Sequence, residues 1–145
     1  MDIIRRNTDY ALRAMVNLAE NYSEEPVSVR TISQQEDISY QLACKLMQKL
    51  HNAKLLESMM GPKGGFRLKR EPSKINLLEV IEAIQGPLNF NRCLLSENAC
   101  GRKKNCSITG RLAELQGQVG DYLSSVTLNQ VVEENNGKRK LRPRK

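Results

Sequence analysis

Apolar residues recur at helical spacing in two stretches near the start of the chain. Residues 8–21 predict an amphipathic helix that Asn7 or Thr8 can cap. A second, shorter helix follows Ser28, whose hydroxyl is suited to cap it. The apolar stripe of the first helix consists of Tyr10, Ala14, Met15, Leu18 and Ala19. This pattern predicts a core that is built from short helices.

A third helix, which Ser39 can cap and which runs to about Lys54, has two different faces. Its apolar face consists of Leu42, Ala43, Leu46, Leu50 and Ala53. Its polar face carries no carboxylate and consists of Tyr40, Gln41, Cys44, Lys45, Gln48 and Lys49. Two helices joined by a tight turn, the second with a donor-rich outer face, are typical of a helix-turn-helix unit.

Residues 56–70 change from helical spacing to a period of two. Gly61–Pro62 and Gly64–Gly65 predict a turn, and the alternation of apolar and basic residues after it predicts a strand. Both Gly64 and Gly65 are expected to allow positive φ at the tip and a close backbone approach. The segment is therefore interpreted as a basic β-hairpin, the wing of a winged helix.

Two further helices are predicted in the second half of the chain. Asn76 and Glu79 predict a capping box at the start of a helix that Gly86–Pro87 ends. A heptad-like seam then runs from Ile108 to Val126, although its glycines each weaken a helix by about 1 kcal/mol. Such a helix gains stability from packing, and a symmetric partner helix is the simplest source.

The predicted fold class is mainly α: a winged helix-turn-helix with a small hairpin wing and a long C-terminal dimerisation helix. Residues 1–87 form the DNA-binding region, and residues 88–107 form a cysteine loop. Residues 108–132 comprise the dimerisation helix and a segment that packs back on the domain. Residues 133–145 form a basic tail that is predicted to be disordered and to add salt-dependent affinity for DNA.

The formal net charge of +7 and the isoelectric point of about 9.4 favour nucleic acid or an anionic membrane surface as partner. No apolar run approaches the length of a membrane span, and no signal peptide is evident, so a cytoplasmic protein is expected. No combination of residues predicts a hydrolytic site, and an enzyme is not expected. The predicted DNA-binding residues are Arg30, Ser39, Tyr40, Gln41, Lys45, Gln48, Lys49, Lys63, Gly64, Gly65 and Arg67.

Cys93, Cys100 and Cys106 form a C-x6-C-x5-C pattern among four basic residues. Zinc sites usually contain closely spaced cysteine pairs, which this pattern lacks. The wider spacing suits an iron–sulfur cluster, and nearby cations would stabilise its negative charge. The loop supplies three ligands, and His51 is distant in sequence, so the fourth ligand stays open. The alternative is three free thiols or a redox disulfide. Cys44, on the third helix, is either a tolerated small residue or an oxidisable thiol.

With these residues, the chain resembles the Rrf2 family of winged-helix transcription regulators from about residue 4 to residue 132. The marks of the resemblance are residues 8–13, 38–39, 61–68, 80–87 and 127–128, together with the three loop cysteines. It implies a homodimer with crossed long helices that binds a palindromic operator in double-stranded DNA. It also implies a 4Fe–4S cluster, with 2Fe–2S as the alternative, that senses iron, nitric oxide or redox state.

The resemblance further implies a fourth ligand. In the nitric-oxide-sensor branch an aspartate from the partner subunit ligates the cluster, and Asp9 occupies that position here. The assembly-regulator branch uses a histidine three residues after the last cysteine, and this ligation is not available here, because Thr109 stands at that position. Asp9 could instead complement the helix dipole or pair with Arg13. Two functions compete with a cluster-controlled regulator: a cluster-free thiol-switch repressor and a small iron–sulfur carrier.

Overall fold

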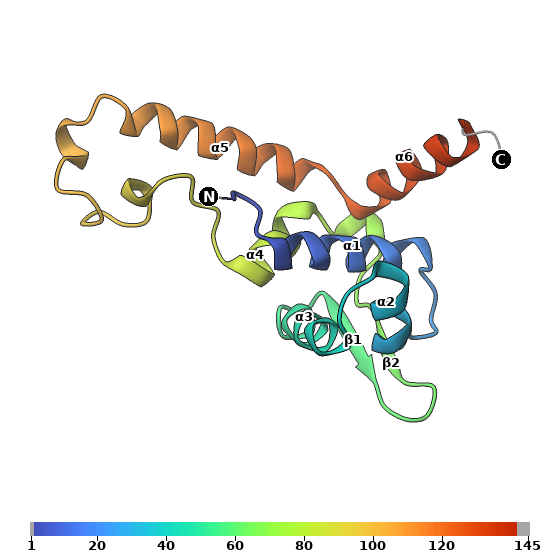
Figure 1. Ribbon diagram of the computed structural model, residues 1–145. Coiled ribbons are helices and arrows are strands. Elements are labelled where there is room, and N and C mark those ends of the chain that lie inside the picture. The colour runs from blue at the N-terminus through green and yellow to red at the C-terminus, as the bar shows by residue number, and fades with distance from the viewer. Residues whose placement is uncertain (1, 142–145) are drawn as a thin grey trace.

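The computed structural model describes residues 2–141, in which six α-helices accompany one two-stranded hairpin (Figure 1). The elements are α1 (Arg6–Glu20), α2 (Val29–Glu36), α3 (Tyr40–Asn52), β1 (Leu56–Met59), β2 (Gly65–Leu68), α4 (Leu77–Gln85), α5 (Thr109–Ser125) and α6 (Leu128–Leu141). Short 3-10 turns lie at Pro72–Lys74, Arg92–Leu94 and Lys103–Asn105. The predicted fold class, mainly helical with a hairpin wing, is confirmed.

Three of the predicted helix caps are confirmed. The hydroxyl of Ser28 accepts a hydrogen bond from the Thr31 amide at 3.1 Å, and that of Ser39 accepts from the Leu42 amide at 3.3 Å. Asn76 and Glu79 form a reciprocal capping box, with both bonds at 3.0 Å. These local signals fix where α2, α3 and α4 begin.

The predicted cap of α1 is wrong. The helix begins at Arg6, and its N-cap residue Arg5 makes no side-chain capping bond. Thr8 is fully buried, and its hydroxyl donates to Gln85 Oε1 of α4 at 2.7 Å. The same oxygen accepts the Arg5 amide at 3.1 Å, and Gln85 Nε2 donates to the Ile3 carbonyl at 2.8 Å. A side chain far along the chain therefore satisfies polar groups at the start of α1.

The core gathers around α1, which contacts α2, α3, α4, α6 and the second strand of the hairpin. Its fully buried side chains come from every element of the winged-helix region and include Met15, Ile32, Leu46, Met47, Leu50, Leu56, Ile75 and Val80. Burial of one such side chain stabilises the fold by about 1.5–3 kcal/mol. The predicted apolar stripe of α1 is confirmed, because Ala14, Met15, Leu18 and Ala19 are all buried.

The predicted wing is present as an antiparallel hairpin in which Glu57 lies opposite Arg67. Arg67 Nε pairs with Glu57 at 3.0 Å, and Arg67 Nη1 donates to the Glu24 carbonyl at 2.6 Å. Phe66 exchanges backbone hydrogen bonds with Val27. A Cβ on Gly65 would lie 2.1 Å from the Val27 carbonyl oxygen, so only glycine fits there. These contacts fix the hairpin to the segment before α2.

The long helix α5 lies along the side of the molecule opposite the hairpin tip, and the cysteine loop lies beyond its N-terminal end (Figure 1). It contacts α4. None of its residues, all of which the structure describes, is buried. Along the predicted seam Ile108, Leu115 and Tyr122 are 60%, 46% and 67% exposed. The periodicity correctly predicts the helix, but the rest of the described chain covers only part of its apolar seam: Leu112, Val119 and Val126 are half-buried.

The last helix corrects the prediction of a disordered tail from residue 133. Leu128 is fully buried and its amide bonds to the Ile75 carbonyl, which fixes the start of α6 on the domain. From there the helix continues to Leu141, with an Asn129–Glu133 hydrogen bond of 3.0 Å along one face. The rest of the predicted tail, residues 142–145, lies outside the described residues. Within the described part of the chain, no helix is long and apolar enough to cross a membrane.

Candidate DNA-binding surface and cysteine loop

The predicted polar face of α3 lies on the surface of the protein. Tyr40, Gln41, Lys45, Gln48 and Lys49 are exposed, whereas Cys44 among them is half-buried. No acidic residue lies in the first turn of this helix. Gln48 Nε2 donates to Asn52 Oδ1 at 3.1 Å, which restricts the amide but leaves its oxygen free to accept. The structure therefore places on one exposed face of α3 donors and acceptors of the kinds that contact base edges and phosphates.

Other predicted DNA-binding residues have local structural roles. The Ser39 hydroxyl caps α3, and Arg67 is engaged with Glu57 and the Glu24 carbonyl. Gly64 and Gly65 are required by close backbone approach, since a Cβ on Gly64 would lie 2.4 Å from the Met59 carbonyl oxygen. The expected positive φ occurs at Gly61 and Gly65 rather than at Gly64.

At the wing tip, Lys63 is exposed as predicted, but the sequence reasoning missed its neighbour Met60. Met60 is 95% exposed, the highest value among the large apolar side chains of the described chain. The signal that could have found it is an apolar pair, Met59–Met60, directly before the Gly61–Pro62 turn. Apolar side chains of this kind can contact the minor groove of DNA.

The cysteine loop joins α4 to α5 and is attached to the protein near its start. Leu88 is 7% exposed, and the Phe90 amide donates to Gln116 Oε1 of α5 at 3.0 Å. Further along, Lys103 Nζ donates to the Ser96 carbonyl at 3.2 Å, which ties the two halves of the loop together. The loop therefore has a defined base and contacts the N-terminal half of α5.

The three loop cysteines are free thiols that differ in exposure. Cys93 and Cys100 are half-buried, and Cys106 is exposed. Among residues 2–141, no three His, Cys, Asp or Glu side chains gather into a group that could hold a metal ion. The structure therefore does not bring the three predicted ligands together. Their chemistry nevertheless fits a soft metal centre, because thiolates are the ligands of iron–sulfur clusters.

Cys106 has the most distinctive electrostatic environment of the three. The Thr109 hydroxyl lowers the pKa of the Cys106 thiol, and the backbone N–H groups of Ile108 and Thr109 lower it further. The buried Thr109 hydroxyl makes no hydrogen bond of normal geometry within the described chain. These donors lie where α5 begins, which is an environment that favours a thiolate.

Asp9 is exposed on the first turns of α1. Its carboxylate makes no hydrogen bond or ion pair with any residue from 2 to 138 in this structure. Arg13, which could have paired with Asp9, pairs instead with Glu36, with Nε 3.5 Å from Oε2, and donates to the Glu36 carbonyl. The carboxylate of Asp9 is therefore available to a ligand from outside the chain.

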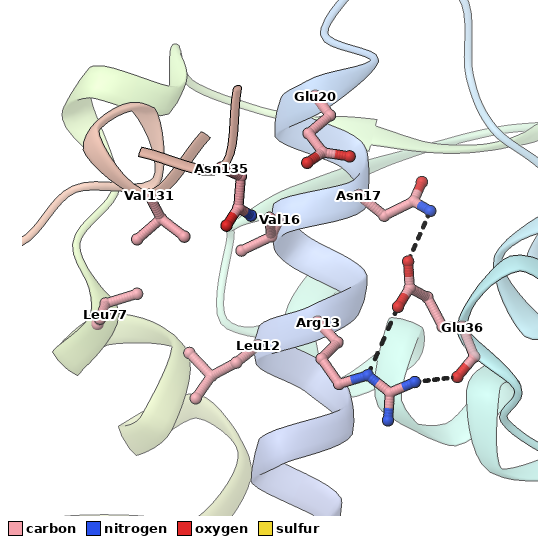
Figure 2. Close-up of a pocket in the computed structure, with 9 residues that line it drawn as sticks. All are labelled: Leu12, Arg13, Val16, Asn17, Glu20, Glu36, Leu77, Val131 and Asn135. Atoms are coloured by element: carbon pink, nitrogen blue, oxygen red, sulfur yellow. Dashed lines mark hydrogen bonds and ion pairs between the residues drawn. The ribbon is translucent and has the colours of Figure 1, made fainter. Parts of the chain in front are cut away.

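A polar network connects α1 to the end of α2 (Figure 2). Besides the Arg13–Glu36 pair, the buried Asn17 donates through Nδ2 to Gln35 at 2.9 Å and to Glu36 at 2.8 Å. These contacts border a groove of about 410 Å³ between α1, α4 and α6. The helix that carries Asp9 is thus attached directly to the helix-turn-helix.

Comparison with known proteins accounts for this combination of a winged helix with a cysteine loop. The sequence profile of the Rrf2 family, described as iron-dependent transcriptional regulators, matches residues 4–134. The chain belongs to the Rrf2 family. It is 33% identical to an HTH-type transcriptional regulator of Neisseria meningitidis, over 88% of this chain and 85% of that protein. It is also 29% identical to the HTH-type transcriptional regulator IscR of Vibrio campbellii, over 87% of this chain and 74% of that one.

Two solved structures have the same fold as this chain. CymR, the global cysteine regulator of B. subtilis, superposes with a TM-score of 0.77 at 26% identity, over 92% of this chain and 98% of that chain. T. potens IscR superposes with a TM-score of 0.73 at 24% identity, over 98% and 93%. This Rrf2 protein is therefore a DNA-binding helix-turn-helix transcriptional regulator with an IscR-like winged helix, and its family is one of regulators rather than enzymes.

Proposed function

We propose that this Rrf2 protein is a homodimeric regulator of a palindromic operator whose affinity is controlled by an iron–sulfur cluster. Cys93, Cys100 and Cys106 would hold the cluster, 4Fe–4S in preference to 2Fe–2S, and the partner's Asp9 would supply the fourth ligand. Reaction or loss of the cluster, through iron limitation, nitric oxide or redox change, would alter operator binding. When bound, the cluster supplies an iron centre that such agents can attack or remove.

The observation that carries this proposal is the position of three free cysteines in one loop between α4 and α5. The three donors of the loop are soft, and the lowered pKa of Cys106 favours its ligating thiolate form. Arg92, Arg102 and Lys104 are exposed around the thiols and would balance the negative charge of a ligated cluster. The family's description as iron-dependent agrees with this donor set.

The homodimer is supported by the exposed seam of α5. A helix with no buried residue has little packing to stabilise it, and three glycines interrupt it. A second copy would cover Leu115 and Tyr122 with the same residues of its own helix. Two winged helices related by this symmetry would contact two half-sites of a palindrome.

Asp9 would connect the cysteine loop of one protomer to the helix-turn-helix of its partner. A carboxylate binds iron more weakly than a thiolate, so this bond would be the one most readily broken. A displacement of α1 would act on α2 through the Arg13–Glu36 and Asn17–Glu36 contacts. Since α2 packs on α3, this path would change the orientation of the recognition helix.

A cluster-free thiol switch is the second candidate, because two observations favour it. The thiols are not gathered into one metal-binding group within the described chain, and Cys106 combines exposure with a lowered pKa. An exposed thiol of lowered pKa is the type that oxidation modifies first. The fold is also that of CymR, the global cysteine regulator of B. subtilis.

The deciding experiment is anaerobic purification of the full chain, followed by an absorption spectrum with iron and acid-labile sulfide assays. A 4Fe–4S protein would contain about four irons and four sulfides per chain. Replacing Cys93, Cys100 or Cys106 with Ala should abolish the chromophore, whereas the control Cys44→Ala should retain it. Asp9→Ala should retain the cluster but release it faster under a chelator. A colourless protein that takes up no iron on reconstitution would favour the thiol switch.

A further inference from the structure

A cation–π contact joins the first turns of the two helices of the helix-turn-helix. The guanidinium carbon of Arg30, in α2, lies 5.2 Å from the centre of the Tyr40 ring, the first residue of α3. Both side chains are exposed, and Tyr40 is 49% exposed. The contact therefore lies at the surface, at the N-terminal end of the helix that carries the predicted base-reading residues.

Helix stability does not explain an arginine at this position. A cation in the first turn of a helix is disfavoured by the helix dipole, and neither α2 nor α3 has an acidic residue in its first turn. The Arg30 guanidinium makes no ion pair or hydrogen bond with residues 2–138. By contrast, Arg13, Arg67 and Arg70 each pair with a glutamate within 3.5 Å. Arg30 therefore retains all its N–H donors for a partner outside the chain.

The Tyr40 ring limits where those donors can lie. A free arginine side chain loses rotamer entropy when it is fixed, and contact with an aromatic ring reduces the part lost on binding. The guanidinium carbon lies over the Tyr40 ring while both side chains are exposed, so N–H groups of Arg30 stay accessible. The positive ends of α2 and α3 add to the attraction for an anion in the same place.

We propose that Tyr40 positions Arg30 to bind a phosphate of the DNA backbone beside the groove that α3 enters. Tyr40 acts here as a positioning residue, through its ring rather than its hydroxyl. The proposal deepens the DNA-binding role of the helix-turn-helix and is independent of any cluster. It assigns Arg30 to orientation and salt-dependent affinity, and leaves base discrimination to the outer face of α3.

The test is a double-mutant cycle on the full-length protein. The variants are Arg30→Gln, Tyr40→Leu, Tyr40→Phe and the double variant Arg30→Gln/Tyr40→Leu. The probes are a duplex selected by the wild-type protein from a random-sequence pool and an unselected duplex of equal length. Fluorescence anisotropy over a series of salt concentrations gives affinity and salt slope on both probes. Arg111→Gln is the matched control, because it removes one positive charge from an exposed arginine on α5.

The proposal expects Arg30→Gln to weaken binding to both duplexes by about tenfold and to lower the salt slope by about 0.9 per bound chain. Tyr40→Leu should weaken binding by about two- to fivefold, whereas Tyr40→Phe should stay within twofold of wild type. The double variant should bind no more weakly than Arg30→Gln alone. Arg111→Gln should have no comparable effect on the slope.

Three outcomes would overturn the proposal. An unchanged salt slope in Arg30→Gln would exclude a phosphate contact. If the affinity losses of Arg30→Gln and Tyr40→Leu multiply in the double variant, Tyr40 acts independently of Arg30. A loss in Tyr40→Phe equal to that in Tyr40→Leu would assign the effect to the hydroxyl. Thermal unfolding separates these outcomes from misfolding, because exposed substitutions at both sites should leave the melting temperature nearly unchanged.

Discussion

The winged-helix region and α5 contain apolar residues in equally regular patterns, but only the first region buries them. Every buried apolar residue of the described chain lies between Ala11 and Leu88, apart from Leu128, which packs against the same core. In α5 the seam residues Leu115 and Tyr122 are 46% and 67% exposed. Helical periodicity therefore predicts that a face is apolar but does not identify what covers it. The winged helix is completed by its own chain, whereas α5 is suited to a second molecule.

The winged-helix region and α5 also differ in what stabilises them. The winged-helix region combines a packed core with side-chain caps on α2, α3 and α4. The helix α5 has no side-chain cap at Ile108 and contains Gly110, Gly117 and Gly120. Substitutions in the two regions should consequently affect different equilibria, unfolding in one and association in the other.

The largest effect on unfolding is expected from Leu50→Ala in α3. Leu50 is fully buried in the core, so the substitution removes buried methyl groups and leaves a cavity. The free energy of unfolding should fall by about 2–5 kcal/mol, as measured by urea denaturation of the full chain. A loss below about 1 kcal/mol would mean that the core around α3 can collapse onto the cavity, contrary to the packing described.

A smaller effect on unfolding is expected from Asn76→Ala at the start of α4. The substitution removes the 3.0 Å bond from the Glu79 amide to Asn76 Oδ1, but it keeps the backbone N–H of residue 76 that donates to the Glu79 carboxylate. The free energy of unfolding should fall by about 0.5–2 kcal/mol. Asn98→Ala, in the exposed part of the cysteine loop, is the matched control and should change it by less than about 0.5 kcal/mol. Equal losses in both variants would argue that the capping box adds no stability.

The features predicted correctly from sequence are those with local causes. Ser28, Ser39 and Asn76 act on amides three residues away, and the hairpin follows from a turn flanked by alternating residues. The features missed depend on distant contacts. Thr8 bonds to Gln85, 77 residues along the chain, and Arg67 donates to the Glu24 carbonyl, 43 residues away. No local pattern distinguishes such residues from a helix cap or a DNA-binding arginine.

The cysteine loop shows a related limit of prediction from sequence. The spacing of three cysteines predicts a donor set, but it does not determine whether the side chains meet within one chain. In the structure they are not gathered within residues 2–141, and Asp9 lies on α1, a separate element from their loop. Assembly of such a site would couple metal binding to ordering of the loop. The sequence therefore predicts the chemistry of the ligands but not their geometry.

The smallest effect on unfolding of the single chain, and the sharpest test of the comparison, is expected from Leu115→Ala. Because Leu115 is 46% exposed and α5 buries no residue, unfolding at concentrations where the protein is monomeric should change by less than about 0.5 kcal/mol. In a dimer the same side chain would lie in the seam, and its truncation should raise the dissociation constant by about tenfold. Sedimentation equilibrium measures this constant, and dilute urea denaturation measures unfolding. A loss of stability like that of Leu50→Ala in the monomer would mean that the chain itself packs on the seam, and an unchanged dissociation constant would remove α5 from the dimer interface.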